Sequence, residues 1–269
     1  MLGDSSTLHP SHPLDWTDEY VVRSYESDAE GKVSLPTLCR FFQESAWHHA
    51  ESMRLGYAHL AERGVFWVLS RLSVRMTRYP IWGERVRVRT WASGLDRLFA
   101  LRDFTVGDER GEIICAAVSG WLVLGEATRK PQRPEKLFEG AAVLPHIHAF
   151  EGGPEKIPVL ERPEKGPAVT ARYGDIDMQG HVNNARLAEW ILDGFPAETH
   201  RKRRVSRFSI NFLAECSCGD CVSVQTEQAA GGGESSPIVG AADDGGAYLA
   251  NILRESDGRE ICRARVTWV

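Results

Sequence analysis

The sequence predicts an α+β protein in which one unit, an antiparallel sheet with one long helix, occurs twice. Two observations carry this prediction. The chain repeats itself at three registers that keep the same order, and each copy reads as a strand, a long helix and then several alternating strands. The size agrees, because 269 residues with 42% hydrophobic content suffice for two units of about 130 residues.

The repeat is visible without gaps inside each matched segment. The aligned segments are, at a shift of 136, LSRLSV (69–74) with VSRFSI (205–210); at a shift of 147, GEIICAAVSGWL (111–122) with GREICRARVTWV (258–269); and at a shift of 149, DAEGKVSL (28–35) with DMQGHVNN (177–184). Three registers in one order indicate two copies of the same unit with insertions between its elements.

The first copy begins its helix after Ser34, which is a typical N-cap residue. Apolar side chains then recur at helical spacing from Leu35 to Met53, ahead of Gly56, so we expect one long helix here. The segment RVRVRTW (85–91) alternates arginine with valine, which is typical of a strand with one face in water. Several such strands follow one another, and the sheet should therefore be antiparallel.

The second copy has Asn183 as its N-cap and a helix that runs to about Asp193, before Gly194. Between the copies lies a stretch that holds seven of the thirteen prolines, which indicates a connector. The expected division is a tail (1–14), a first unit (15–126), a connector (127–167) and a second unit (168–269). A tandem (double) hotdog, with two antiparallel sheets each wrapped around a central helix, would fit this order, although propensities alone support only a duplicated α+β unit.

The composition excludes several classes of function. A net charge of −5 gives no reason to expect nucleic acid or an anionic membrane as a partner. Six cysteines in a chain of this length are expected to be reduced thiols, as in the cytoplasm. The opening MLGDSSTLHPSHPLDW has no basic region before an apolar stretch, and no run of about 18 apolar residues follows. We therefore expect a cytoplasmic protein that neither enters nor crosses a membrane.

One stretch, YGDIDMQGHVNN (173–184), is crowded with polar side chains, and its chemistry is confined to the second copy. The repeat places Asp177, Gln179 and His181 opposite Asp28, Glu30 and Lys32, and it places Glu215 and Cys216 opposite Tyr79 and Pro80. At these aligned positions only the second copy has an imidazole, and only the second copy has the titratable pair Glu215 and Cys216. This asymmetry indicates one chemical site per chain.

These residue types suit the transfer of an acyl group to water. A histidine just before a helix N-terminus lies beside backbone N–H groups that can polarise a carbonyl. Asp177 could orient the imidazole, Gln179 could hold a carbonyl or a water, and Glu215 or Cys216 could serve as base or nucleophile. The alternative is that these side chains only tie down a turn and cap a helix, and that Cys216 is a small buried residue.

A metal site is not expected, and neither is a cofactor. The run ECSCGDC (215–221) offers three thiols, but it has no obvious fourth ligand nearby.

Three further segments resemble a known family, the acyl-acyl carrier protein thioesterases of plants and bacteria. They are WVLSRLSVRMTRYPIWGERVRVRTW in the first copy, YGDIDMQGHVNNARLAEWILD in the second, and the later AEC; the resemblance runs from about Asp15 to Val269. In that family a D-x-N-x-H segment precedes the second helix, and an E-C pair follows with its cysteine some 35 residues beyond the histidine. Cys216 lies 35 residues beyond His181 here.

The resemblance implies a tandem hotdog fold that hydrolyses fatty acyl thioesters on the carrier protein and so ends chain elongation. It places Asp177, His181, Glu215 and Cys216 on the family's active-site positions. Gln179 departs from the pattern, because the family has asparagine there; the longer side chain puts in doubt how the carbonyl or the water is held. Whether Cys216 attacks the carbonyl, or Glu215 activates water through His181, stays open at this point.

Two other functions use similar residues. A hotdog dehydratase acting on hydroxyacyl thioesters also needs a histidine and an acid, and a binding module would hold acyl thioesters without turning them over. The products separate the three: free fatty acid, enoyl thioester or unchanged ligand. Preferences for chain length and saturation cannot be inferred from the sequence.

The expected partner is acyl carrier protein, which by the resemblance is strongly acidic. The basic segment HRKRRVSR (200–207) is a candidate docking surface for it. The apolar face of the first helix, with Phe42, Ala46 and Met53, leads us to expect the acyl tail against the first unit; the alternative is that these side chains are simply core. A homodimer is a candidate assembly state.

Overall fold

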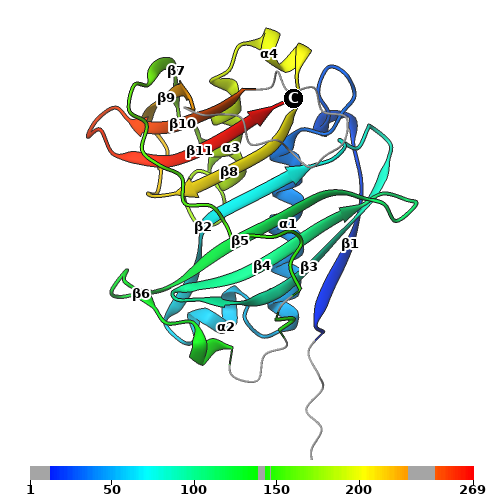
Figure 1. Ribbon diagram of the computed structural model, residues 1–269. Helices are drawn as coiled ribbons and strands as arrows, with labels where there is room; N and C mark the ends of the chain where they lie inside the picture. Colours follow the sequence, from blue (N-terminus) through cyan, green and yellow to red (C-terminus); the bar gives the residue numbers. More distant parts are fainter. Residues whose placement is uncertain (1–12, 139–142, 146, 230–245) are drawn as a thin grey trace, which may run out of the picture.

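The computed structural model describes residues 13–138, 143–145, 147–229 and 246–269. Most of the expected tail (1–14) lies outside these ranges. Within them the strands form one antiparallel sheet of eleven strands around two central helices (Figure 1). The elements of the first unit are β1 (Asp15–Val21), α1 (Leu35–Ser52), α2 (Tyr57–Ala61), β2 (Val65–Met76), β3 (Arg85–Asp96), β4 (Phe99–Gly107) and β5 (Ile113–Gly125). Those of the second are β7 (Glu164–Thr170), α3 (Asn184–Asp193), α4 (Ala197–Lys202), β8 (Val205–Phe212), β9 (Cys221–Gln228), β10 (Ala247–Arg254) and β11 (Glu260–Trp268).

The strand order confirms the duplicated unit. It runs β1-β3-β4-β5-β2 in the first unit and continues β8-β11-β10-β9-β7 in the second, so equivalent strands stand in mirrored order. Two separate sheets were expected, but β2 pairs with β8 and joins the halves edge to edge. The pairing satisfies the backbone N–H and C=O groups of two strands that would otherwise be exposed edges. The fold is the expected tandem hotdog with a continuous sheet.

The shift of 136 residues locates the pseudo-two-fold axis. It makes Ser73 equivalent to Ser209, and these two residues face each other in the middle of the β2–β8 pairing, with their Oγ atoms 3.0 Å apart. The shift of 149 residues also relates equivalent positions in the structure. The bridge between Ser27 and Val33 recurs between Ile176 and Val182. Segments matched by sequence alone thus occupy the same places in the two units.

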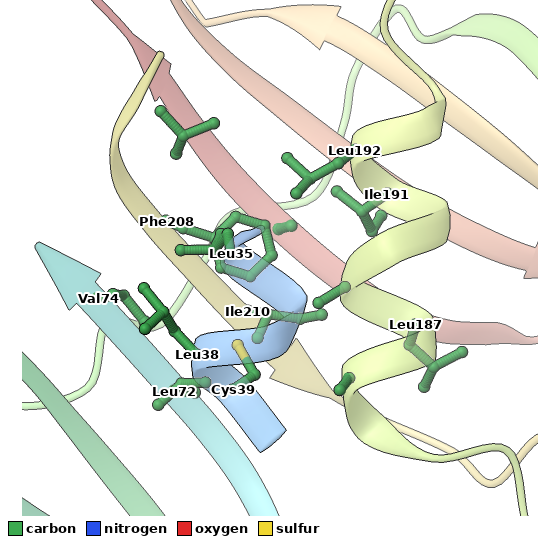
Figure 2. Close-up of a cluster of buried hydrophobic side chains, with 14 of the residues drawn as sticks. Leu35, Leu38, Cys39, Leu72, Val74, Leu187, Ile191, Leu192, Phe208 and Ile210 are labelled. Atoms are coloured by element: carbon green, nitrogen blue, oxygen red, sulfur yellow. The ribbon is translucent and has the colours of Figure 1, made fainter. Parts of the chain in front are cut away.

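Both helices begin where the sequence predicts. The Ser34 Oγ accepts a hydrogen bond from the backbone N–H of Thr37, and the Asn183 side chain accepts one from the N–H of Ala185. The first helix ends at Ser52, short of Gly56, and a short turn leads into α2. Figure 2 shows how the two helices pack over the junction of β2 and β8 and share one apolar cluster. Its labelled side chains are Leu35, Leu38 and Cys39 from α1, Leu187, Ile191 and Leu192 from α3, and Leu72, Val74, Phe208 and Ile210 from the strands.

The connector is more structured than its prolines suggest. It contains the short strand β6 (Pro131–Gln132), which pairs with β5, and β7 begins at Glu164, ahead of the expected boundary at 168. Part of it crosses the junction of the two units, where the backbone N–H of Glu155 donates to the Ser73 Oγ. The N–H of Ile157 donates to the Asn211 Oδ1 nearby. The connector therefore fastens the two halves at the pseudo-two-fold axis.

A buried polar layer interrupts the core of the first unit. The Arg102 Nη1 donates to the His49 Nδ1 at 2.8 Å and to the Thr90 Oγ1 at 3.2 Å. Because Nδ1 accepts, the ring proton is on Nε2, which donates to the Pro13 carbonyl at 3.0 Å. Burial, with the nearby arginine, lowers the pKa of His49 to about 4. The imidazole is therefore neutral in the folded protein.

We expect the free energy of unfolding to fall as the pH is lowered from 6.5 towards 4, and to fall less in His49→Gln. An ordinary histidine titrates at 6.5. Between the two pKa values the unfolded chain binds more protons than the folded one, which favours unfolding. At the acid end this amounts to about 3 kcal/mol. Urea unfolding at a series of pH values measures the effect, and parallel curves for the two proteins would contradict it.

Candidate active site

The polar stretch of the second unit folds into a tight turn ahead of α3. The backbone N–H of Asp177 donates to the His181 carbonyl at 2.9 Å, and the N–H of Gly180 donates to the Asp177 carbonyl at 3.0 Å. Gly180 has φ +85°, a region that favours glycine, so the turn needs this residue. The Asp177 Oδ1 accepts from the N–H of Gln179 at 2.9 Å and closes the turn. Several of the polar groups thus build the turn itself.

The structure brings His181 and Glu215 together. The His181 Nε2 lies 3.2 Å from the Glu215 Oε2, and the two side chains are 32% and 57% exposed. The main chain sets this distance, because the N–H of Val182 donates to the Cys216 carbonyl at 2.8 Å. The same bond joins Val33 to Pro80 in the first unit. The His181–Glu215 pair is therefore positioned by a main-chain hydrogen bond that both units contain.

Two arginines that the sequence gave no reason to select also contact Glu215. The Arg129 Nη1, from the turn after β5, lies 3.7 Å from the Glu215 Oε1. The Arg254 Nη2 donates to the Glu215 carbonyl at 2.7 Å. Arg129 lies at the start of the connector (127–167), just after β5 of the first unit, so a segment from outside the second unit reaches the site. Only the tertiary arrangement reveals these contacts, since both residues are far from Glu215 in sequence.

The thiol of Cys216 does not join this pair. The residue is 1% exposed and belongs to the apolar cluster that the two units share. Burial raises the pKa of its thiol to about 11, and the nearby carboxylate of Asp220 adds to the effect. A thiol with that pKa is protonated near neutral pH, and the thiolate is the nucleophilic form. The geometry therefore favours Glu215 and His181 over Cys216 as the reacting groups.

Asp177 and Gln179 make different contacts around the His181–Glu215 pair. The Asp177 Oδ2 lies 3.4 Å from the Asn183 Nδ2, which also donates to the Gln43 Oε1 on α1 at 3.2 Å. Asp177 thus couples the turn to both helices. Gln179 is exposed, and its backbone N–H donates to the Asp177 carboxylate within the turn. Its side chain lies on the solvent side of the turn, where it can contact a ligand.

The corresponding turn of the first unit is closed by charge pairs. The Arg204 Nη1 lies 3.1 Å from the Asp28 Oδ2, and the same guanidinium contacts Glu30. Glu30 also pairs with Lys32 at 3.1 Å. The first copy keeps the turn but fills it with an arginine, in agreement with one chemical site per chain.

The basic segment 200–207 lies far from Glu215, although its His200, Arg203 and Arg204 line the same hollow as Asp177 and Asn183. Part of it forms the end of α4, and Lys202 pairs with Glu198 at 2.6 Å. Arg204 precedes β8, whereas Glu215 follows its other end. Eight residues of extended strand separate them, which is about 26 Å.

All six cysteines fall within the described residues and are free thiols. Cys218 is exposed, and the Cys221 Sγ lies 3.5 Å from the Glu255 Oε2. None of the helices that the structure describes is long and apolar enough to cross a membrane.

Comparison with known proteins agrees with this arrangement. The chain matches the acyl-ACP thioesterase N-terminal domain over residues 13–138 and the acyl-ACP thioesterase C-terminal domain over 162–269. An acyl-[acyl-carrier-protein] hydrolase of Cuphea viscosissima is 28% identical over 95% of this chain and 63% of its own length. Oleoyl-acyl carrier protein thioesterase 1 of Arabidopsis thaliana is also 28% identical, over 95% of this chain and 76% of its own.

A solved structure is similar over nearly its whole length. The acyl-ACP thioesterase from Bacteroides thetaiotaomicron superposes with a TM-score of 0.80 at 28% identity, over 95% of this chain and 98% of that one. The chain spans between 60% and 63% of the length of three Cuphea relatives, which are named chloroplastic. Both domain models match in order along the chain, over residues 13–138 and 162–269. The chain therefore belongs to the acyl-ACP thioesterase family.

Proposed function

We propose that this protein hydrolyses fatty acyl thioesters of acyl carrier protein and releases free fatty acid. The observation that carries the proposal is the contact between His181 and Glu215, at 3.2 Å, in an accessible turn at the N-terminus of α3. The names of its relatives and the matched domains point to the same reaction.

In this mechanism water attacks the thioester carbonyl while the His181–Glu215 pair takes its proton. The backbone N–H of Asn184, at the start of α3, and the amide of Gln179 stabilise the negative charge on the carbonyl oxygen, because the N–H groups of Ala185 and Arg186 already donate to Asn183. The tetrahedral intermediate then collapses, the C–S bond breaks, and the leaving thiolate recovers the proton from the pair. Asp177 keeps the turn in place. Thioester hydrolysis needs no further catalytic groups, because the thioester carbonyl is poorly resonance-stabilised and the thiolate leaves readily.

Analysis of the products by mass spectrometry tests the proposal. Acyl carrier proteins loaded with octanoyl to stearoyl chains are expected to yield free fatty acid and free carrier thiol. A hydroxyacyl substrate that gives an enoyl thioester would identify a dehydratase instead. Substrate that is bound but unchanged would identify a binding module.

We also propose that the carrier docks beside Glu215 on residues 129–136, which we call the site-side basic segment. Its cationic side chains are Arg129, Lys130, Arg133 and Lys136, and all four residues are exposed. Support comes from position, since Arg129 reaches Glu215 whereas the segment 200–207 lies at the far end of β8. A positive surface at the mouth of the site attracts an acidic carrier.

Reversing charge at Lys130 and Arg133 is expected to raise KM for acyl carrier protein substrates severalfold at low salt, with kcat little changed. Salt screens such attraction, so the wild type should approach the variant as ionic strength rises. Charge reversal at Arg201 and Arg203 is the matched control and should leave KM unchanged. The assignment is wrong if only the control variant raises KM, because docking then uses segment 200–207.

The two units are expected to have different roles in catalysis. We propose that the first unit (15–126) receives the acyl tail and that the second unit (168–269) supplies the catalytic residues. A cytoplasmic location is supported by the free thiols. A homodimer stays a prediction, which analytical ultracentrifugation would test.

A further inference from the structure

The side chain of Arg254, the last residue of β10, joins two points of the loop between β8 and β9 (213–220). Its Nη2 donates to the Glu215 carbonyl at 2.7 Å, and its Nε lies 3.3 Å from the Asp220 Oδ2. Its Nη1 lies 3.6 Å from the Asp257 Oδ2. The shortest of these contacts is with the main chain of Glu215, and a hydrogen bond from a charged donor is stronger than one between neutral groups.

Asp220 holds the guanidinium in place. The carboxylate oxygen that faces Arg254 also accepts a hydrogen bond from the backbone N–H of Ser217 at 2.8 Å. The N–H of Ala171, directly after β7, donates to the Asp220 carbonyl at 2.9 Å, and the N–H of Gly219 donates to the Ala171 carbonyl at 2.8 Å. Asp220 is thus attached to its own loop and to the end of β7, so it anchors Arg254 independently of Glu215.

The main chain at Glu215 is held at two consecutive carbonyls. Arg254 contacts the carbonyl of Glu215, and the N–H of Val182, the neighbour of His181, donates to the Cys216 carbonyl at 2.8 Å. Glu215 is an exposed residue, so packing contributes little to the placement of its carboxylate. The two main-chain contacts therefore set the position from which the carboxylate reaches His181.

The first unit fastens the equivalent loop differently. The shift of 136 places Tyr79 opposite Glu215 and Glu84 opposite Asp220. There Arg78 donates to the Glu84 carboxylate at 2.7 and 2.9 Å, whereas its contact with the Tyr79 carbonyl, at 3.5 Å, is at the limit of a hydrogen bond. In the unit without the chemical pair, the guanidinium thus binds a carboxylate closely and the main chain only weakly.

The arginine of the second unit comes from another position of the repeat. Arg254 stands where the first unit has Asp108, because the N–H of Arg254 donates to the Arg259 carbonyl as the N–H of Asp108 donates to the Glu112 carbonyl. The shift of 147 makes Arg259 and Glu112 equivalent. An acid of the first unit is therefore replaced by a cation in the second, and this cation makes its closest contact with the residue that carries the catalytic carboxylate.

We propose that Arg254, anchored by Asp220, is a positioning residue that holds Glu215 where it can act with His181 on the attacking water. This inference rests on the proposed function. Arg254 contacts the carbonyl of Glu215 and not its carboxylate, so it acts through Glu215 and takes no proton itself. A displacement of about 1 Å in a reacting group can lower the rate about 10²-fold. Loss of the guanidinium therefore lowers kcat and leaves substrate binding nearly unchanged.

Steady-state kinetics of Arg254→Met with an acyl carrier protein substrate tests this role. We expect kcat to fall about tenfold to 10²-fold, with KM within about twofold of the wild type. Arg254→Lys keeps a charged donor and should recover part of the lost kcat. Arg78→Met is the matched control, because it removes the guanidinium that fastens the equivalent loop of the first unit, and it should keep wild-type kcat.

A double variant separates positioning from a merely structural role. In Glu215→Gln the carboxylate that Arg254 positions is gone, so adding Arg254→Met should cause no further loss of kcat. A further loss as large as the one in the wild type would overturn the inference, and so would an Arg254→Met enzyme with wild-type kcat.

A second variant carries the test if Arg254→Met does not fold. Asp220→Asn keeps an oxygen for the N–H of Ser217 but removes the charge that anchors Arg254. It should lower kcat severalfold in the wild type and not in Glu215→Gln; an unchanged kcat in the wild type would contradict the role of Arg254. If the wild type hydrolyses no acyl carrier protein substrate, the proposed function fails, whereas equal losses of kcat in Arg254→Met and Arg78→Met refute only the positioning role.

Discussion

Replacement of His181 by alanine is expected to lower kcat by about 10²- to 10⁴-fold, which is the usual contribution of a general base. The imidazole lies 3.2 Å from Glu215, so its loss leaves the carboxylate without the group that relays the proton. The side chain is 32% exposed, so the variant should fold normally. Steady-state kinetics with an acyl carrier protein substrate measures the effect.

The matched control is Lys32→Ala, which makes the equivalent change in the first copy. Lys32 occupies the position of His181 in the equivalent turn, and its ammonium group pairs with Glu30. This variant should retain wild-type kcat. Comparable losses in the two variants would mean that the turn matters for structure and that His181 has no special chemical role.

Most of the fold could be predicted because the chain carries its own internal comparison. The three registers recur as matched bridges and strand pairs, and the shift of 136 even identifies Ser73 and Ser209 as the pair on the pseudo-two-fold axis. The joining of the two sheets could not be predicted in this way. Edge pairing between β2 and β8 depends on how two complete units dock, and no local pattern records it.

The site shows the same division between local and tertiary information. Glu215 returns to His181 after 34 residues, because α3, α4 and β8 lead the chain away from the turn and back to it. The sequence could not show that Cys216 is buried in the core or that Arg129, from the turn after β5, contacts Glu215.

The choice between activated water and an acyl-enzyme is decided by comparing Glu215→Gln with Cys216→Ala. Glu215→Gln keeps the shape of the side chain but removes the basic carboxylate, so kcat should fall about 10²-fold or more. Cys216→Ala should keep kcat within about threefold and cost about 1 kcal/mol of stability, because it removes one small buried atom from the core.

Chemical modification provides an independent check on Cys216. Burial raises the pKa of its thiol to about 11, so the thiolate is scarce at neutral pH and iodoacetamide should label exposed Cys218 first without inactivating the enzyme. An acyl-enzyme requires the opposite pattern: loss of activity in Cys216→Ala, retention in Glu215→Gln, and an acylated Cys216 trapped on rapid quenching. Since the Cys216 carbonyl holds the N–H of Val182 at 2.8 Å through the main chain, alanine preserves that bond. A large loss in Cys216→Ala would then come from the thiol itself and would overturn the water mechanism.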